Sequence, residues 1–352
     1  MRVLLIKTSS LGDVIHTLPA LTDAARAIPG IQFDWVVEEG FAEIPRWHPA
    51  VAEVIPVAIR RWRKNLLTTW RSGEWRACKQ RLGAQPYDLI IDAQGLVKSA
   101  WLTRYAQGPV AGLDRASARE PFASRFYDRP QAVAWGQHAV ERVRQLFAAA
   151  LNYPLPDGIG DYGLDLQQLG LPDKTEPYLV FLHGTTWDSK HWPELYWRQL
   201  AERAIAEGLQ VCLPWGNSAE QARAERVAAD LPGVSVLPKL NLAGVAGVLA
   251  GAKACVAVDT GLGHLAAALD VPTLSLFGPT NPGFTGAYGA RQQHLASDFA
   301  CAPCLRKQCN YQPTAEEQAR FDLTREQPLC FTRLNPASVM ARLQLLLASE
   351  AT

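Results

Sequence analysis

Short apolar runs alternate with longer segments of helical period along most of the chain. The pattern predicts helices over Asp13–Ile28 and Gly95–Tyr105, and further helices that begin near Pro193, Ser218, Leu242 and Gly261. Two successive strand–helix series indicate two parallel sheets, each doubly wound with helices. The expected strands are Val3–Lys7, Phe33–Glu38, Val54–Ile59, Asp88–Asp92, Pro109–Leu113, Tyr178–His183, Gln210–Trp215, Val234–Leu237, Ala254–Asp259 and Thr273–Phe277.

The length of the chain also favours two domains. With 352 residues it exceeds the size at which a single core stops growing, about 250 to 300 residues. Turn residues crowd the stretch Asp157–Pro177, which is the best candidate for a linker. We therefore expect domains over residues 1–165 and 176–334, and a final helix within 335–352 that follows Asn335-Pro336.

A glycine turn follows one of the strands expected in the second domain. Asp259-Thr260-Gly261-Leu262-Gly263-His264 lies between this strand and a helix-forming segment. Such a turn places free backbone N–H groups at a helix N-terminus, where an anion is favoured. Gly261, Gly263 and Ala266 also match the dinucleotide fingerprint, but the acidic residue that this motif requires about 20 positions later is missing. The turn therefore predicts a phosphate site rather than a nicotinamide site.

The first strand of each domain is followed by residues that could carry chemistry. In the second domain, Thr185, Thr186 and Lys190 offer hydroxyl donors and a positive charge to phosphate oxygens. In the first domain, Asp13 lies at the expected start of a helix. It is either an N-cap or a general base at the carboxyl ends of the strands, where ligands bind in open α/β sheets.

A basic stretch marks the first domain. It begins at Arg60-Arg61-Trp62-Arg63-Lys64 and continues, with further tryptophans, to Arg81. Such a stretch could bind nucleic acid, an anionic lipid surface or an acidic saccharide, or it could be a solvated amphipathic helix that buries its tryptophans. Residues 1–150 carry a net charge of +6, because 20 Lys and Arg oppose 14 Asp and Glu, whereas residues 151–352 carry −5, with 15 against 20. A pI near 7.6 argues against a nucleic-acid-binding module.

Four cysteines towards the end of the chain could hold zinc. Cys301, Cys304 and Cys309 are followed by Cys330, but this spacing lacks a second close pair, so free thiols in a loop-rich insertion are the alternative. An odd total of seven cysteines suits a reducing compartment, and no apolar run approaches the roughly 20 residues of a membrane span. We therefore expect a cytosolic protein.

Three motifs carry a resemblance to a known family. Lys7–Ala20, Lys190–Glu194 and Asp259–His264 resemble, in order and spacing, the bacterial lipopolysaccharide heptosyltransferases of glycosyltransferase family 9. The resemblance implies a GT-B fold, which has two facing Rossmann-like domains and a C-terminal helix that crosses back to the first. It also implies an inverting transfer of L-glycero-D-manno-heptose from ADP-heptose to a Kdo (3-deoxy-D-manno-octulosonic acid) residue of Kdo2-lipid A. No Asp-x-Asp occurs in the chain, in agreement with metal-independent chemistry without a cofactor.

The resemblance also assigns roles to individual residues. Asp13 would be the general base, and Lys190 would stabilise the leaving diphosphate. Residues 1–165 would bind the acceptor, and residues 176–334 would bind ADP-heptose. The donor residues would be Thr185, Thr186, Lys190, Glu220, Leu240, Asp259, Thr260, Gly261, Leu262, Gly263 and His264, and the acceptor residues Ser10, Arg60, Arg61, Arg63 and Lys64.

The family further implies a monomer that works as a peripheral protein on the cytoplasmic face of the inner membrane, with no nucleic-acid partner. Two other enzymes stay open as alternatives. One is a nucleotide-sugar epimerase of the same fold, which would need no anionic acceptor. The other is a heptosyltransferase that acts later in the inner core.

Overall fold

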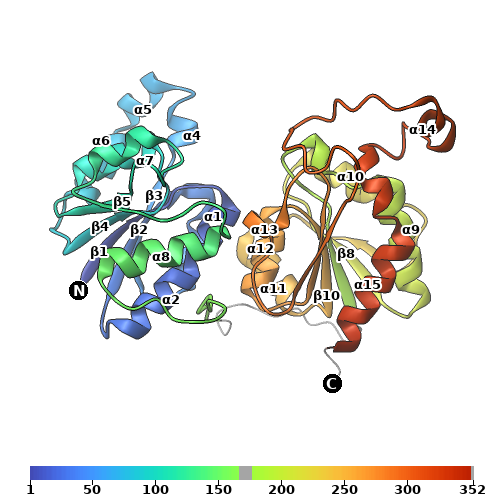
Figure 1. Cartoon of the computed structure of the whole chain (residues 1–352), viewed down its shortest axis with the longest axis horizontal. Helices are drawn as coiled ribbons and strands as arrows, with labels where there is room; N and C mark the ends of the chain where they lie inside the picture. Colours follow the sequence, from blue (N-terminus) through green and yellow to red (C-terminus); the bar gives the residue numbers. More distant parts are fainter. Residues whose placement is uncertain (166–176, 350–352) are drawn as a thin grey trace. The chain divides into compact units, whose positions relative to one another are not determined.

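The computed structural model describes residues 1–165 and 177–349 and divides the chain into two compact units, Met1–Gln168 and Leu169–Thr352 (Figure 1). Residues 166–176, which belong to the predicted linker, and residues 350–352 lie outside the described part. Each unit is built on its own parallel sheet. The fold class predicted from the sequence is therefore confirmed.

The first unit contains a six-stranded sheet in the order β3-β2-β1-β4-β5-β6. Every neighbouring pair in this sheet is parallel. This strand order is that of a Rossmann-type fold. The order reverses between the neighbouring strands β1 and β4, and their carboxyl ends therefore form the topological switch point. The strands are β1 (Arg2–Ile6), β2 (Gln32–Glu38), β3 (Val51–Val57), β4 (Leu89–Asp92), β5 (Val110–Leu113) and β6 (Arg129–Gln131).

Helices cover both faces of this sheet because successive strand residues point to opposite sides. On one face, α2 and α8 pack side by side, and Phe147 of α8 meets Phe33 of β2. On the other face, Leu4 and Ile6 lie in a core with Trp62 of α4. The helices are α1 (Leu11–Ile15), α2 (Leu18–Ala27), α3 (Glu43–Arg46), α4 (Ile59–Trp62), α5 (Leu66–Ser72), α6 (Glu74–Leu82), α7 (Val97–Ala100) and α8 (Ala139–Leu151), and the 3-10 turns are η1 (Glu39–Phe41), η2 (Trp101–Tyr105) and η3 (Pro121–Phe126).

The second unit repeats the same topology. Its parallel strands lie in the order β12-β11-β10-β7-β8-β9, so its switch point is between β7 and β10. The strands are β7 (Tyr178–Leu182), β8 (Gln210–Leu213), β9 (Val234–Val236), β10 (Ala254–Val258), β11 (Thr273–Phe277) and β12 (Gln292–Ala296).

Helices α9 to α12 of this unit begin within a residue of where the sequence predicts, whereas α13 and α14 were not predicted. Asn217 caps α10 by accepting a hydrogen bond from the Glu220 N–H at 3.0 Å, and Asn241 caps α11 in the same way at Gly244, at 2.9 Å. The helices are α9 (Glu194–Ala206), α10 (Ser218–Ala228), α11 (Leu242–Ala250), α12 (Gly261–Ala268), α13 (Pro282–Thr285), α14 (Ala315–Arg320) and α15 (Pro336–Ser349), and the 3-10 turns are η5 (Asp188–Lys190) and η6 (Leu329–Arg333).

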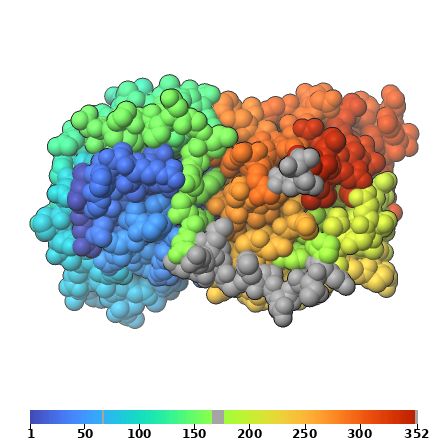
Figure 2. Space-filling model, turned by 90° about the horizontal axis from the view of Figure 1, so that it is seen from below, coloured from blue at the N-terminus to red at the C-terminus, as the bar shows by residue number. Residues whose placement is uncertain are grey.

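The last helix packs within the second unit. Helix α15 packs on α9, as Figure 1 shows. In Figure 2 the red C-terminal segment lies next to orange and yellow segments of the same unit. The crossing back to the first domain that the resemblance implies stays a prediction. Its side chains Val339, Met340, Leu343 and Leu346 are buried in the core of that unit. Burial of this apolar stripe against α9 fixes its position.

Local boundaries also differ from the sequence pattern. The helix expected over Asp13–Ile28 is divided into α1 and α2, with Pro19 in the first turn of α2. Proline lacks the N–H that a continuous helix would use there. Strands β6 and β12 were missed, because neither Arg129–Gln131 nor Gln292–Ala296 has the apolar run that marks the buried strands.

Candidate functional site

In the second unit, the loops after β7 and β10 meet at the switch point. The Thr185 hydroxyl donates a hydrogen bond of 2.9 Å to the main-chain oxygen of Asp259. This bond joins two loops that lie 74 residues apart in the sequence. It brings the Thr185 and Asp259 motifs into one site, as the sequence predicted for strand ends at the same sheet edge.

Helix α12 begins beside this bond. Its N-cap residue, Thr260, has an extended backbone, and its side chain does not cap the helix. The first amides of α12, at Gly261 and Leu262, therefore offer donors where the helix dipole favours an anion. A Cβ on Gly263 would approach the Ala257 side chain to 3.3 Å, so the small residue lets α12 lie close to β10. His264 is buried in the first turn of the same helix.

Lys190 is fixed next to this helix start. Its Nζ lies 2.7 Å from Asp259 Oδ2, and the Thr280 hydroxyl donates to the same oxygen at 2.7 Å. The ammonium also lies 4.4 Å from the centre of the Trp187 ring, a cation–π contact. The lysine and aspartate side chains are only 14% and 10% exposed, so water screens their interaction weakly. Thr280 was missed by sequence reasoning, although it follows the end of β11.

Glu220, in the first turn of α10, lies against the loop after β7. One Glu220 oxygen accepts the Gly216 N–H at 2.8 Å, and a Cβ on Gly184 would lie 2.8 Å from the Glu220 carboxyl carbon. Glycine at position 184 thus lets the carboxylate lie against the β7 loop. Leu240 is half-buried in the loop before α11, and Thr186 is exposed on the β7 loop.

In the first unit, Gln94 joins the loops after β1 and β4. Its side-chain oxygen accepts the N–H groups of Thr8 at 2.9 Å and Ser9 at 3.1 Å. Lys7 is buried and donates from Nζ to the Ala93 main-chain oxygen at 2.8 Å. Burial lowers the pKa of Lys7, while the nearby charge of Asp13 opposes this shift. The switch point therefore holds a constrained lysine side chain beside Asp13.

Asp13 is not the N-cap of α1, because Ser10 holds that position. The Ser10 N–H and hydroxyl both donate to Asp13 Oδ2, at 2.7 and 2.8 Å, so the Asp13 side chain satisfies the N–H of the N-cap residue. Asp13 also lines a cavity of about 450 Å³ in the first unit, together with Lys7, His16, Gln94, Arg119 and Arg142. A carboxylate in a cavity with two arginines and a lysine can accept a proton next to a bound acidic ligand.

Arg119 and Arg142 are candidate binding residues that sequence reasoning missed. Arg142 donates to the Ser117 main-chain oxygen at 2.7 Å and lies 3.8 Å from the centre of the Trp135 ring, and burial lowers its pKa. Arg119 is exposed on the loop after β5. Gln94 could have been found because it follows a predicted strand, but nothing local marks an arginine on α8.

The basic stretch is not uniformly available to a ligand. Arg61 makes ion pairs with Glu39 at 3.0 Å and Glu74 at 2.8 Å, and hydrogen bonds to these carboxylates raise its pKa. Arg60, Arg63 and Lys64 are exposed. The Arg60 guanidinium lies 5.5 Å from the centre of the Phe41 ring.

Some tryptophans of the basic stretch are buried and others are exposed. Trp62 is buried in the core, Trp75 packs on it with ring centres 5.6 Å apart, and Trp70 is exposed. The interpretation of the basic stretch as an amphipathic helix with buried tryptophans therefore holds for Trp62 but not for Trp70.

The four cysteines of the zinc hypothesis lie in the second unit. Cys301, Cys304 and Cys309 line a cavity of about 410 Å³, and Cys330 is buried in the core. Within residues 1–165 and 177–349, no group of three or more potential ligands has the arrangement needed to hold a metal ion. In the same part of the chain, no helix is long and apolar enough to cross a membrane.

Two Rossmann-type units, one of which presents a helix N-terminus and a lysine at its switch point, define an α/β enzyme of the GT-B glycosyltransferase class. The model of glycosyltransferase family 9 (heptosyltransferase) matches residues 75–315. The chain belongs to this family.

Relatives and solved structures agree with this assignment. Lipopolysaccharide heptosyltransferase 1 of Pseudomonas aeruginosa is 74% identical over 353 residues, which cover 100% of this chain and 99% of that protein. The protein of the same name from Escherichia coli K12 is 57% identical over 294 residues, 83% of this chain and 92% of its own. The structure of the E. coli heptosyltransferase WaaC with ADP superposes with a TM-score of 0.82 at 56% identity, covering 84% of this chain and 93% of that one.

Proposed function

We propose that this protein transfers L-glycero-D-manno-heptose from ADP-heptose to the Kdo residue of Kdo2-lipid A, with inversion at the anomeric carbon. The observation that carries the proposal is the convergence of Lys190, Thr185 and the start of α12 on one anion site. The relatives named lipopolysaccharide heptosyltransferase 1 support the reaction. A second WaaC structure, with ADP-2-deoxy-2-fluoro heptose, supports the donor.

The donor would bind in the second unit. The backbone at Thr260–Gly263 and the hydroxyls of Thr185 and Thr186 would donate to the diphosphate, and Lys190 would neutralise the charge that develops on the leaving ADP. His264 would lie beside the phosphates. Glu220 and the backbone near Leu240 would contact the nucleoside.

Asp259 would have two functions in this site. Its carboxylate already accepts from Lys190 and Thr280 at Oδ2, which fixes its orientation. A carboxylate has further lone pairs, so it would also accept hydrogen bonds from heptose hydroxyls. A single residue would then hold both the sugar and the lysine that stabilises the leaving group.

The acceptor would bind in the first unit. The cavity that contains Asp13 combines a carboxylate with Lys7, Arg119 and Arg142, which suits the carboxylates of a Kdo disaccharide. Ser10 lies at its edge through the bonds to Asp13. The exposed residues of the basic stretch, Arg60, Arg63 and Lys64, would meet the phosphates of lipid A, while Arg61 would hold the stretch to Glu39 and Glu74.

The reaction would be a single displacement. A Kdo hydroxyl attacks the anomeric carbon, Asp13 accepts the proton of this hydroxyl, and the bond from the anomeric carbon to the diphosphate oxygen breaks. The electron pair of that bond leaves with ADP, whose charge is stabilised by Lys190 and by the amides of α12. The oxocarbenium-like character of the transition state makes stabilisation of the leaving group as important as the base.

The remaining predictions belong to the same proposal. We infer a monomeric protein without a cofactor that works at the cytoplasmic face of the inner membrane. The predicted facing of the two domains stays a prediction.

Incubation with ADP-heptose, with and without Kdo2-lipid A, tests the reaction. Release of ADP and a heptosylated lipid only in the presence of the acceptor supports transfer. Conversion of the donor without acceptor would instead support the epimerase. Transfer only to an acceptor that already carries heptose would support the later inner-core enzyme.

A further inference from the structure

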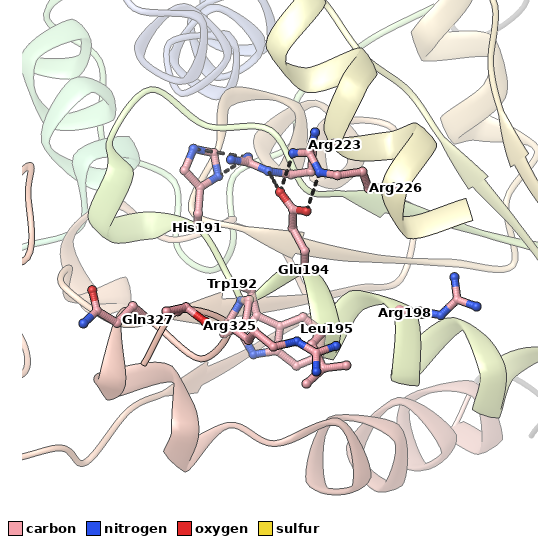
Figure 3. A pocket seen from close by; sticks show the side chains of 11 residues that line it. His191, Trp192, Glu194, Leu195, Arg198, Arg223, Arg226, Arg325 and Gln327 are labelled. Atoms are coloured by element: carbon pink, nitrogen blue, oxygen red, sulfur yellow. Dashed lines mark hydrogen bonds and ion pairs between the residues drawn. The ribbon is translucent and has the colours of Figure 1, made fainter. Parts of the chain in front are cut away.

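The second unit also contains a pocket that is rich in arginine. It has a volume of about 420 Å³ and lies where the start of α9, helix α10 and residues 324–327 come together (Figure 3). Arg198 comes from α9, Arg223 and Arg226 come from α10, and Arg325 comes from the segment before η6. None of the residues proposed for the donor lines this pocket.

Only one carboxylate among the lining residues opposes these charges. Glu194 accepts from Arg226 Nε at 2.8 Å and Nη2 at 2.7 Å, and from Arg223 Nε at 3.4 Å. The hydrogen bonds from Arg226 hold the pKa of Glu194 below its usual range. The carboxylate is therefore ionised at neutral pH, and it orients both α10 guanidinium groups towards the start of α9 (Figure 3).

The histidine of the pocket adds a contact but no negative charge. His191 Nδ1 lies 2.5 Å from Arg223 Nη1, and burial together with the charge of Arg223 lowers the pKa of His191. The ring is thus neutral at pH 7 and presents a nitrogen lone pair to the guanidinium. Arg198 also pairs with Glu202, and Arg325 lies near Asp322, but neither of these carboxylates lines the pocket, so Glu194 is the one lining carboxylate that opposes four lining arginines.

Neighbouring guanidinium groups repel one another, and a bound anion relieves this repulsion. Arg226 is exposed, so an anion from solution can reach it. Arg325 is exposed. Arg198 donates to the Ala229 main-chain oxygen and lies 3.4 Å from Glu202. Guanidinium groups bind phosphate oxygens in a bidentate manner, and the volume of the pocket is within the usual range for a small ligand.

We propose that this pocket is a second anion site, separate from the donor site, that binds a diphosphate or a similar phosphate ester. Arg226 and Arg325 supply the main contacts, and Glu194 positions Arg226. The source of the phosphate is either a soluble compound or the headgroup of an anionic lipid. This site does not depend on the function proposed above.

Calorimetric titration of the full-length protein with inorganic pyrophosphate tests the site. ADP is titrated first and kept in excess, so that the donor site is filled. We expect one further pyrophosphate to bind without displacing ADP. The Arg226→Gln/Arg325→Gln variant should weaken this binding at least tenfold, the usual loss for a charged hydrogen bond to phosphate. Arg203→Gln is the matched control, because Arg203 is an exposed arginine of α9 outside the pocket, and it should bind as the wild type does.

Two results would overturn the proposal. One is the absence of pyrophosphate binding in the ADP-saturated wild type, and the other is equal binding by the wild type and the double variant. If ADP itself fails to bind, the donor assignment fails, and the same titration without ADP still tests the arginine pocket. Arg325→Gln alone keeps the test valid if the double variant is unfolded, because Arg325 is exposed.

Vesicle flotation then identifies the source of the phosphate. Vesicles of phosphatidylcholine with phosphatidylglycerol are compared for the wild type and the double variant. A parallel loss of vesicle binding and of pyrophosphate binding indicates a lipid headgroup. Loss of pyrophosphate binding alone indicates a soluble phosphate compound.

Discussion

The ammonium of Lys190 lies 2.7 Å from Asp259 Oδ2, and both side chains are largely buried. The pair joins the loop before α9 to the loop before α12. A diphosphate that binds at the start of α12 would therefore enter a site in which the lysine is already in place. Such preorganisation reduces the reorganisation needed when charge develops on the leaving group.

Replacement of Lys190 by alanine should weaken both ADP binding and turnover. The change removes a charged donor and leaves the Asp259 carboxylate without its cation, so we expect losses of about ten- to a hundredfold in each. Calorimetry with ADP and steady-state kinetics measure the two effects. Lys253→Ala is the control, because Lys253 is exposed before β10. Wild-type kinetics for Lys190→Ala would remove this residue from the site.

Asp13→Asn should separate donor binding from catalysis. Asparagine keeps an oxygen that can accept from Ser10 and so preserves the cap of α1, but it cannot take the proton of the acceptor hydroxyl. We expect unchanged ADP binding and a fall in kcat of about 10²- to 10⁴-fold. The exposed Asp157 provides the matched Asp→Asn control. A kcat close to that of the wild type would show that another group acts as the base.

Arg119→Gln should weaken binding of the acceptor but not of the donor. Loss of one charged contact to an acidic sugar predicts a rise in the KM for Kdo2-lipid A of about ten- to a hundredfold, with little change in the KM for ADP-heptose. Arg115, exposed on the same loop but outside the cavity, is the control for Arg→Gln. An effect on the donor KM instead would contradict the assignment of the acceptor to the first unit.

Stability of the first unit should fall as the solution becomes acidic, in part because of His48. Its Nδ1 accepts the Ala50 N–H at 3.1 Å, and burial lowers its pKa to about 4. In the unfolded chain the pKa of His48 is near 6.5, so between about pH 6.5 and 4 His48 binds more protons in the unfolded chain than in the folded one. The stability that neutral His48 contributes to the folded state is fully present above pH 6.5 and is lost as the pH falls towards 4.

Urea unfolding at pH 7 and pH 5 measures this effect. Linkage predicts a loss of about 2 kcal/mol from His48 over this interval. His48→Gln should reduce the difference between the two pH values, whatever its effect on stability at pH 7. A variant with the same pH dependence as the wild type would show that other groups cause the acid sensitivity.

Removal of metal ions should leave transfer unchanged. The chain has no Asp-x-Asp motif, and the proposed leaving-group stabilisation uses Lys190 and backbone amides. Assays with and without EDTA compare the initial rates directly. An EDTA-sensitive activity that zinc restores would point to Cys301, Cys304 and Cys309.

Much of the fold could be predicted from the sequence, because buried parallel strands have a local signature. Strands β1 and β7 were located within a residue or two, and the motifs that follow them were recognised as strand-end loops. Weakly apolar strands such as β6 were missed, since their pairing is decided by neighbouring strands. The helix break at Pro19 was also missed, although proline in a helical pattern is a local signal.

The candidate site could likewise be predicted only in part from the sequence. Local sequence was enough to propose Asp13, Lys190 and the glycine turn, because each follows a strand and has the chemistry of its role. It could not show that Arg61 is held by Glu39 and Glu74, that Lys190 pairs with Asp259, or that Arg119 and Arg142 line the cavity of Asp13.

By itself, then, the sequence determined the class of fold, the family and the loops that carry chemistry, because apolar periodicity and short motifs act over a few residues. Only the tertiary structure decided which loops meet. Gln94 bonds to Thr8 across 86 residues, and Thr185 bonds to Asp259 across 74. These contacts depend on the order of strands in each sheet, which sets the switch point and is not encoded in any single segment.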